Sequence, residues 1–214
     1  MSTHGLPDSL LAAMDDRTSG ATIIARRTID GLLEVVDDEA ALRDAADLIE
    51  ARLPWYAPIW HIARAARGRD AAPELRRLRD DLERDTERTI AAAAAWLGRR
   101  PGGIATAPSS SIVARIVTAL GDRARSGEPR TGLAGADAIG PTAVLNIVGT
   151  RRLAQRLPTM IATTSIKLVP EAVFVRLGSP AFERIPLDRF EAVCLDGEIV
   201  DVREAGRRAA QIEA

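Results

Sequence analysis

The sequence predicts an α/β fold, with an N-terminal helical domain followed by a domain built on a parallel sheet. In the first half of the chain, apolar residues recur every three to four positions, which is the period of helices that bury one face. After Gly98 the pattern changes to short apolar runs separated by turn signals and helical segments. Strands that alternate with helices indicate a parallel sheet. We therefore expect two domains, residues 1–98 and 99–214.

Start and stop signals divide the helical half. Asp37 and Asp38 are suitable caps for a helix that Pro54 ends, and Gly68 lies just past a short helix. The longest helix places its Arg, Asp and Glu residues at spacings typical of a solvated face with local ion pairs. The expected helices cover residues 20–36, 37–53, a short stretch with Pro58 in its first turn, and residues 73–97.

Short apolar runs define the expected strands of the second domain. They lie at residues 103–107, 136–139, 143–147, 160–163, 172–177 and 192–195. Helices are expected after the serine run at 109–111, at residues 150–157 and at residues 202–212. The stretch from Gly121 to Gly135 is polar, glycine-rich and without periodicity, so we expect a loop there.

Composition and charge narrow the classes of function. The 214 residues include 29 basic and 30 acidic side chains, and this balance argues against nucleic-acid binding and against docking on an anionic membrane. The sequence contains no apolar run long enough to span a membrane and no signal peptide at its start, so a cytoplasmic protein is expected. A single cysteine, Cys194, and two histidines argue against a metal site, and no cofactor is expected.

Polar residues lie after one expected strand and within another, and open α/β sheets bind ligands at the carboxyl ends of their strands. Ser109, Ser110 and Ser111 begin a helix, and the free N–H groups of a helix N-terminus can hold a phosphate. The alternative is that they only cap the helix. Asp137 lies in a strand-like run, where it is a candidate general acid or base or, alternatively, a turn or cap residue.

Two further segments combine a strand end with polar groups. Asn146, Gly149 and Thr150 join a strand to a helix, so that the Asn146 amide could orient a sugar hydroxyl. A purely structural turn is the alternative. Lys167 is the only lysine of the chain and follows another strand, which is a usual place for a phosphate partner. It could also be an ordinary surface residue.

Four stretches together resemble the translation initiation factor 2B alpha/beta/delta family, whose superfamily includes methylthioribose-1-phosphate isomerase and ribose-1,5-bisphosphate isomerase. They are LPWYAPIWHIA at 53–63, TAPSSSIV at 106–113, GADAIGPTAVLNIVGT at 135–150, and TTSIKLVP at 163–170 with FERIP at 182–186. SGA at 19–21 is similar to the family's early RGA or SGA. The resemblance implies a helical domain followed by a Rossmann-like one, and it adds Gly20 and the nearby Arg17 to the candidate ligand contacts.

The departures from the family pattern concern catalysis. The isomerases that this chain resembles use a Cys and an Asp on opposite sides of the sugar. Asp137 matches the Asp, but Pro108 stands at the Cys position and cannot transfer a proton. The Lys of the family's NKiGT motif is Ile147 here. Strand–helix units with a sugar-binding ESRP stretch are missing between the serine helix and Asp137, and residues 127–135 could be a remnant of them.

The resemblance and its departures lead to three hypotheses. The first is a non-catalytic relative that binds a phosphorylated sugar or nucleotide, or acts through oligomerisation as a homodimer. The second is an aldose–ketose isomerase of a phosphorylated sugar that uses Asp137. The third is a degenerate scaffold without a ligand. Pro108 counts against the isomerase, whereas Asp137, Asn146 and Lys167 count against the scaffold. The apolar run at 172–177, in a sheet too small to cover it, supports the homodimer.

Overall fold

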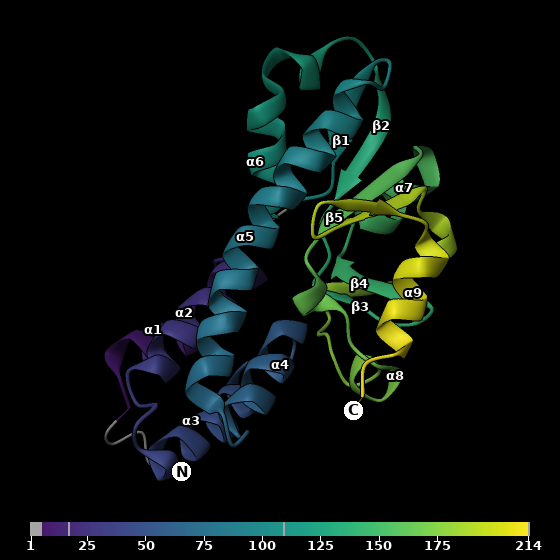
Figure 1. The fold of residues 1–214 in the computed structure, drawn as a ribbon. Helices are drawn as coiled ribbons and strands as arrows, with labels where there is room; N and C mark the ends of the chain where they lie inside the picture. Colours follow the sequence, from purple (N-terminus) through teal and green to yellow (C-terminus); the bar gives the residue numbers. More distant parts are fainter. Residues whose placement is uncertain (1–5, 17, 109, 214) are drawn as a thin grey trace. The chain divides into compact units, whose positions relative to one another are not determined.

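The computed structural model describes residues 6–16, 18–108 and 110–213 (Figure 1). The chain divides into two compact units, Met1–Glu83 and Arg84–Ala214. The boundary lies inside helix α5 (Ala71–Gly98), whereas the sequence suggested a boundary after that helix. The second half of α5 groups with the α/β unit because its apolar stripe, with Ala93 and Leu97 fully buried, packs on the sheet of that unit.

The first unit is helical, as predicted. Its helices are α1 (Asp8–Asp15), α2 (Ala21–Leu33), α3 (Glu39–Arg52), α4 (Ala57–Ala66) and the first half of α5. Helix α1 has no counterpart among the expected helices. The Asp38 carboxylate accepts the backbone N–H groups of Ala40 and Ala41, so the expected cap of α3 is confirmed. Apolar side chains at helical spacing, such as Ile24, Leu32 and Ile49, are fully buried.

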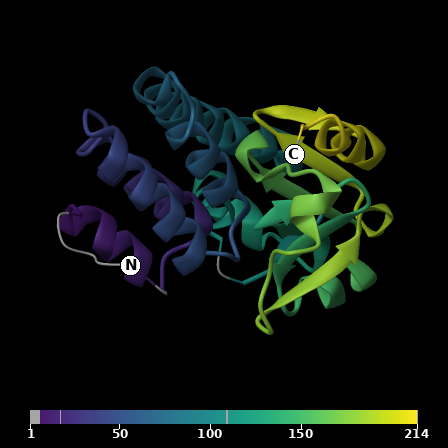
Figure 2. The same ribbon diagram turned by 90° about the horizontal axis from the view of Figure 1, so that it is seen from below.

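The larger sheet of the second unit has the strand order β1-β2-β5-β7-β8. Its strands are β1 (Gly103–Thr106), β2 (Pro129–Ala134), β5 (Thr159–Thr163), β7 (Ala192–Leu195) and β8 (Glu198–Val200). The first four run parallel, and β8 returns antiparallel to β7. Along the chain, helix α6 (Ser111–Leu120) follows β1 and α7 (Thr150–Arg156) precedes β5. Helix α9 (Val202–Ala210) is the last element and is drawn in yellow in Figure 2. The predicted α/β class is therefore confirmed.

A smaller antiparallel sheet has the order β3-β4-β6. Its strands are β3 (Ala138–Ile139), β4 (Ala143–Ile147) and β6 (Phe182–Pro186). Short helical turns complete the unit: η1 (Gly121–Arg125), η2 (Ser165–Lys167), α8 (Glu171–Phe174) and η3 (Leu187–Arg189).

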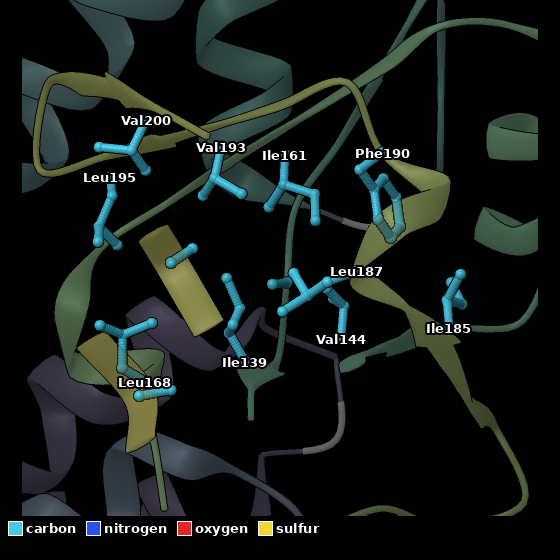
Figure 3. Close-up of a cluster of buried hydrophobic side chains, with 13 residues drawn as sticks. Ile139, Val144, Ile161, Leu168, Ile185, Leu187, Phe190, Val193, Leu195 and Val200 are labelled. Atoms are coloured by element: carbon cyan, nitrogen blue, oxygen red, sulfur yellow. The ribbon is translucent and has the colours of Figure 1, made fainter. Parts of the chain in front are cut away.

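Hydrophobic clusters cover both faces of the larger sheet. On one face, Met160 and Ala162 of β5 pack with residues of α5 and α6. On the other face, Ile161 of β5 and Val193 of β7 pack against Ile139 and Val144 of the smaller sheet (Figure 3). Alternation along β5 therefore buries both of its faces, as expected for a central parallel strand. Within the described residues, no helix is long and apolar enough to cross a membrane.

Two sequence expectations are wrong. Residues 172–177 were expected to form a strand, but they lie in helix α8 and the turn after it. A short apolar run does not distinguish helix from strand, and here Pro170 at the N-cap position begins a helix. The expected loop at 121–135 instead contains η1 and β2. Strand β2 lies between β1 and β5, so it lacks the alternation of a half-exposed strand. Strands β6 and β8 were also missed.

Candidate functional site

The candidate site lies where β1, β2 and β5 end. Ser110 is the N-cap of α6, and its hydroxyl accepts the Val113 N–H at 3.3 Å. Gly135, which follows β2, packs directly against this cap, because a Cβ at Gly135 would lie 2.6 Å from Ser110 Oγ. The glycine of the GAD segment therefore lets β2 end against the N-terminus of α6.

Lys167 comes from the turn after β5 and joins the same group. Its side chain is buried, and Nζ donates a 2.6 Å hydrogen bond to the backbone carbonyl of Ala136. Among the described residues it is the only Lys or Arg that is buried. The alternative of an ordinary surface lysine does not fit this position, because the ammonium lies inside the α/β unit.

Asp137 is close enough to Lys167 to interact with it electrostatically. Burial lowers the pKa of Lys167, and the Asp137 carboxylate partly opposes this shift, so the net pKa lies below the usual value for lysine. Burial likewise raises the pKa of Asp137, while the Lys167 charge opposes this shift. Each group thus supports the charged form of the other at a place where burial disfavours both.

Because Lys167 is the only lysine, its titration can be followed directly. In protein labelled with ¹³C-lysine, the Lys167 side chain is expected to titrate below the value of an exposed lysine. Asp137→Asn should lower the pKa of Lys167 further, because the opposing carboxylate is lost while the burial remains. The measurement is the pH dependence of the lysine Cε signal, with Asp122→Asn as an exposed control that leaves it unchanged. An Asp137→Asn variant with an unchanged or raised Lys167 pKa would contradict this assignment.

The segment Asn146–Thr150 is satisfied by internal contacts. The Asn146 amide donates to Thr150 Oγ1 at 2.9 Å, and this hydroxyl donates to the carbonyl of Ile147 at 2.9 Å. Glu183 of β6 covers the N-terminus of α7, because its Oε1 accepts the N–H groups of Gly149 at 3.0 Å and Arg151 at 2.7 Å. An anion at this turn would have to displace the Glu183 carboxylate. This arrangement supports the structural alternative for Asn146, Gly149 and Thr150.

The GAD and NIVGT segments nevertheless meet through the backbone. The Asp137 N–H donates to the carbonyl of Leu145 at 2.9 Å, which places Asp137 beside the residue that precedes Asn146.

Two buried hydroxyls at the end of β5, Thr163 Oγ1 and Thr164 Oγ1, have no hydrogen-bond partner in the described structure. Such groups are rare in folded proteins, and here they lie in the TTSIK segment that carries Lys167.

The remaining predicted residues are less informative. Ser111 is the first residue of α6, whereas Ser109 lies outside the described residues. Gly20 is the N-cap of α2 in the helical unit, and Arg17 is also outside the described residues. Within the described structure, no group of three His, Cys, Asp or Glu side chains is arranged to hold a metal ion.

The cysteine of the chain lies inside strand β7. Cys194 is fully buried in β7, and its Sγ contacts the carbonyl of Thr89 at 3.6 Å. Burial raises the pKa of this thiol to about 11, so it is protonated at neutral pH. Pro108, which the sequence resemblance placed at the isomerase cysteine position, is exposed between β1 and α6. Neither residue offers a thiolate beside Asp137.

Two contacts of this region were not predicted from the sequence. The carbonyl of Ala136 as the Lys167 acceptor and the Glu183 carboxylate at α7 both join residues about 30 positions apart. A backbone carbonyl carries no sequence signal. Glu183 lies in the FERIP segment, which the family resemblance had singled out, and only the pairing of β4 with β6 shows what it contacts.

The protein belongs to the α/β class, with a largely parallel sheet and polar side chains at the carboxyl ends of its strands. Several solved structures share this fold. Translation initiation factor eIF-2B from Pyrococcus horikoshii OT3 has a TM-score of 0.69 at 17% identity, over 92% of this chain and 98% of that chain. The tetrameric eIF2B-beta2-delta2 complex from C. thermophilum has a TM-score of 0.73 at 14% identity, over 93% and 91%.

An isomerase has the same fold. For 5-methylthioribose 1-phosphate isomerase from Pyrococcus horikoshii OT3 the TM-score is 0.60 at 13% identity, over 94% of this chain and 86% of that chain. No protein-family model and no curated protein matches the sequence. The structural likeness confirms the fold that the sequence resemblance implied.

Proposed function

We propose that the protein is a non-catalytic relative of the initiation factor 2B proteins that binds a small phosphorylated sugar or nucleotide in the cytoplasm. The single observation that supports this most is the buried Lys167 ammonium beside Asp137. Burying a charge costs free energy, and perturbed, buried charges are concentrated at functional sites. The N-terminus of α6, capped by Ser110, lies in the same group and favours an anion.

The roles of the residues follow from their chemistry. The N–H groups at the start of α6 and the serine hydroxyls would hold the phosphate oxygens, with the Lys167 ammonium as the formal positive charge. Asp137 is half-buried and would accept a hydroxyl of the sugar. Of the remaining candidates, Gly20 and Arg17 stay proposals for the helical unit. Asn146 of β4, with Gly149 and Thr150 at the start of α7, would support the site structurally.

A thermal denaturation series tests this function. We expect ribose 5-phosphate, AMP or GMP to raise the unfolding midpoint of the wild-type protein, whereas ribose and adenosine should not. Stabilisation should follow mass action, about 2.7 kcal/mol at a hundredfold excess over the dissociation constant. If no phosphorylated compound raises the midpoint, the ligand-free scaffold is the better description.

The same geometry argues against isomerase activity. We expect no turnover of ribose-1,5-bisphosphate or methylthioribose-1-phosphate, since Pro108 cannot transfer a proton and Cys194 is buried elsewhere as a neutral thiol. A general acid or base contributes about 10²–10⁴-fold to rate. Product formation is followed by chromatography. A turnover on the order of one per second that Asp137→Asn abolishes would instead establish the isomerase.

Self-association is the second part of the proposal. The eIF2B-beta2-delta2 structure is a tetrameric complex, and a protein of the same fold is expected to assemble through its α/β unit. The apolar run at 172–177 no longer supports this, because Val173 and Phe174 are buried within the chain. We expect a homodimer in sedimentation velocity at micromolar concentration. A monomer across that range would remove oligomerisation from the proposed function.

A further inference from the structure

The turn that carries Lys167 is held from outside by the hairpin between β7 and β8. Asp196 and Gly197 form this hairpin turn, with φ of 51° and 87°, values that suit an Asp-Gly turn. The Asp196 carboxylate reaches across to η2, where Oδ1 accepts the backbone N–H of Ser165 at 2.8 Å. Within η2, local backbone bonds run from Lys167 N to Thr164 O at 3.1 Å and from Leu168 N to Ser165 O at 2.9 Å.

The hairpin is itself fixed on α5. A Cβ at Gly197 would lie 2.8 Å from Arg88 Cβ, so the turn packs directly on the helix. The Thr163 carbonyl, at the end of β5, accepts both the Asp196 N–H at 3.4 Å and the Thr89 hydroxyl at 3.2 Å. The chain that leads into η2 is therefore hydrogen-bonded both to α5 and to the β7–β8 hairpin. One of these bonds is made by the Asp196 carboxylate.

We infer that Asp196 is a positioning residue that sets where the Lys167 ammonium lies. The carboxylate holds Ser165 at the beginning of the turn, and two residues later the Lys167 side chain reaches the Ala136 carbonyl. Asp196 acts on Lys167 through η2, by way of the Ser165 N–H. The inference about ligand affinity rests on the proposed function, whereas the inference about lysine position does not.

Two substitutions distinguish the effect of the Asp196 carboxylate from the effect of the backbone conformation at this residue. Asp196→Gly removes the acceptor while keeping the positive φ free of strain, because glycine adopts φ of 51° readily. Asp196→Asn keeps an oxygen acceptor and also tolerates this conformation. If the bond to Ser165 positions the turn, Asp196→Gly should displace the Lys167 ammonium, whereas Asp196→Asn should leave it in place.

The first readout is the Lys167 side-chain signal in protein labelled with ¹³C,¹⁵N-lysine, a single-residue probe in this chain. The second is the dissociation constant for inorganic phosphate and for ribose 5-phosphate. We expect Asp196→Gly to shift the lysine signal and to weaken binding on the order of tenfold, because a displaced Lys167 ammonium loses part of its charged hydrogen bond to the phosphate. Asp196→Asn should remain within about threefold of wild type.

A lysine signal and an affinity that are both unchanged in Asp196→Gly would overturn the inference, even if its thermal midpoint falls. If the wild-type protein binds neither probe, the proposed function fails, and the lysine signal still decides the positioning role. Ser165→Pro is the second variant, because it removes both the backbone N–H and the hydroxyl that bond to Asp196, at the first position of η2, where proline is compatible with a helix. It should reproduce the effect of Asp196→Gly, and the double variant should add little to either. Additive effects would contradict a shared hydrogen bond.

Discussion

Lys167→Met is expected to weaken binding of a phosphorylated ligand by about 10- to 100-fold. A hydrogen bond to a charged group contributes about 1.5–3 kcal/mol, and each 1.4 kcal/mol is a factor of ten. Methionine fills a similar volume without the charge. Isothermal titration of ribose 5-phosphate measures the change, and Arg156→Met, at an exposed position of α7, is a control that should leave the affinity within about twofold.

The affinity for a phosphorylated ligand should fall as the pH rises. The protonated ammonium attracts the anion, so affinity is lost as the pH rises through the pKa of Lys167. Because burial lowers that pKa below the usual value, the loss should begin at lower pH than for an exposed lysine. Lys167→Met should lack this loss. Equal affinities for wild type and Lys167→Met at neutral pH would show that the ammonium only satisfies the Ala136 carbonyl.

Gly206→Ala is expected to lower the free energy of unfolding by roughly 2–3 kcal/mol, the upper part of the range for overpacking. A methyl group at Gly206 of α9 would lie 2.3 Å from the carbonyl oxygen of Pro141, a backbone atom that cannot move aside alone. Alanine ordinarily favours a helix over glycine by about 0.5–1 kcal/mol, so the contact reverses the usual sign.

Urea denaturation of the two proteins measures this effect. Gly98→Ala is the control, because a methyl group at the end of α5 would meet only Leu120 Cδ2 at 3.9 Å, an ordinary contact distance. It should not destabilise the protein. If Gly206→Ala were as stable as Gly98→Ala, α9 would not pack against the β3–β4 turn as closely as the structure shows.

Local patterns predicted most of the helical unit and several strands. The helical period and the Asp38 cap located α2 and α3 to within a few residues, because caps and periodicity depend on neighbours three to four positions away. The serine run likewise marked the start of α6, with Ser110 as its N-cap. By contrast, the strand β2 has no alternation, since its neighbours β1 and β5 bury it on both sides.

By itself, the sequence determined the α/β class, the helices and the segments in which polar groups follow strands, since these depend on short-range spacing. Only the tertiary structure decided which of these groups meet. Gly135 lies against Ser110, and Lys167 reaches the Ala136 carbonyl, while the Glu183 carboxylate covers Gly149. These contacts join residues 25 to 34 positions apart. Strand order and register create them, and no local pattern encodes either one.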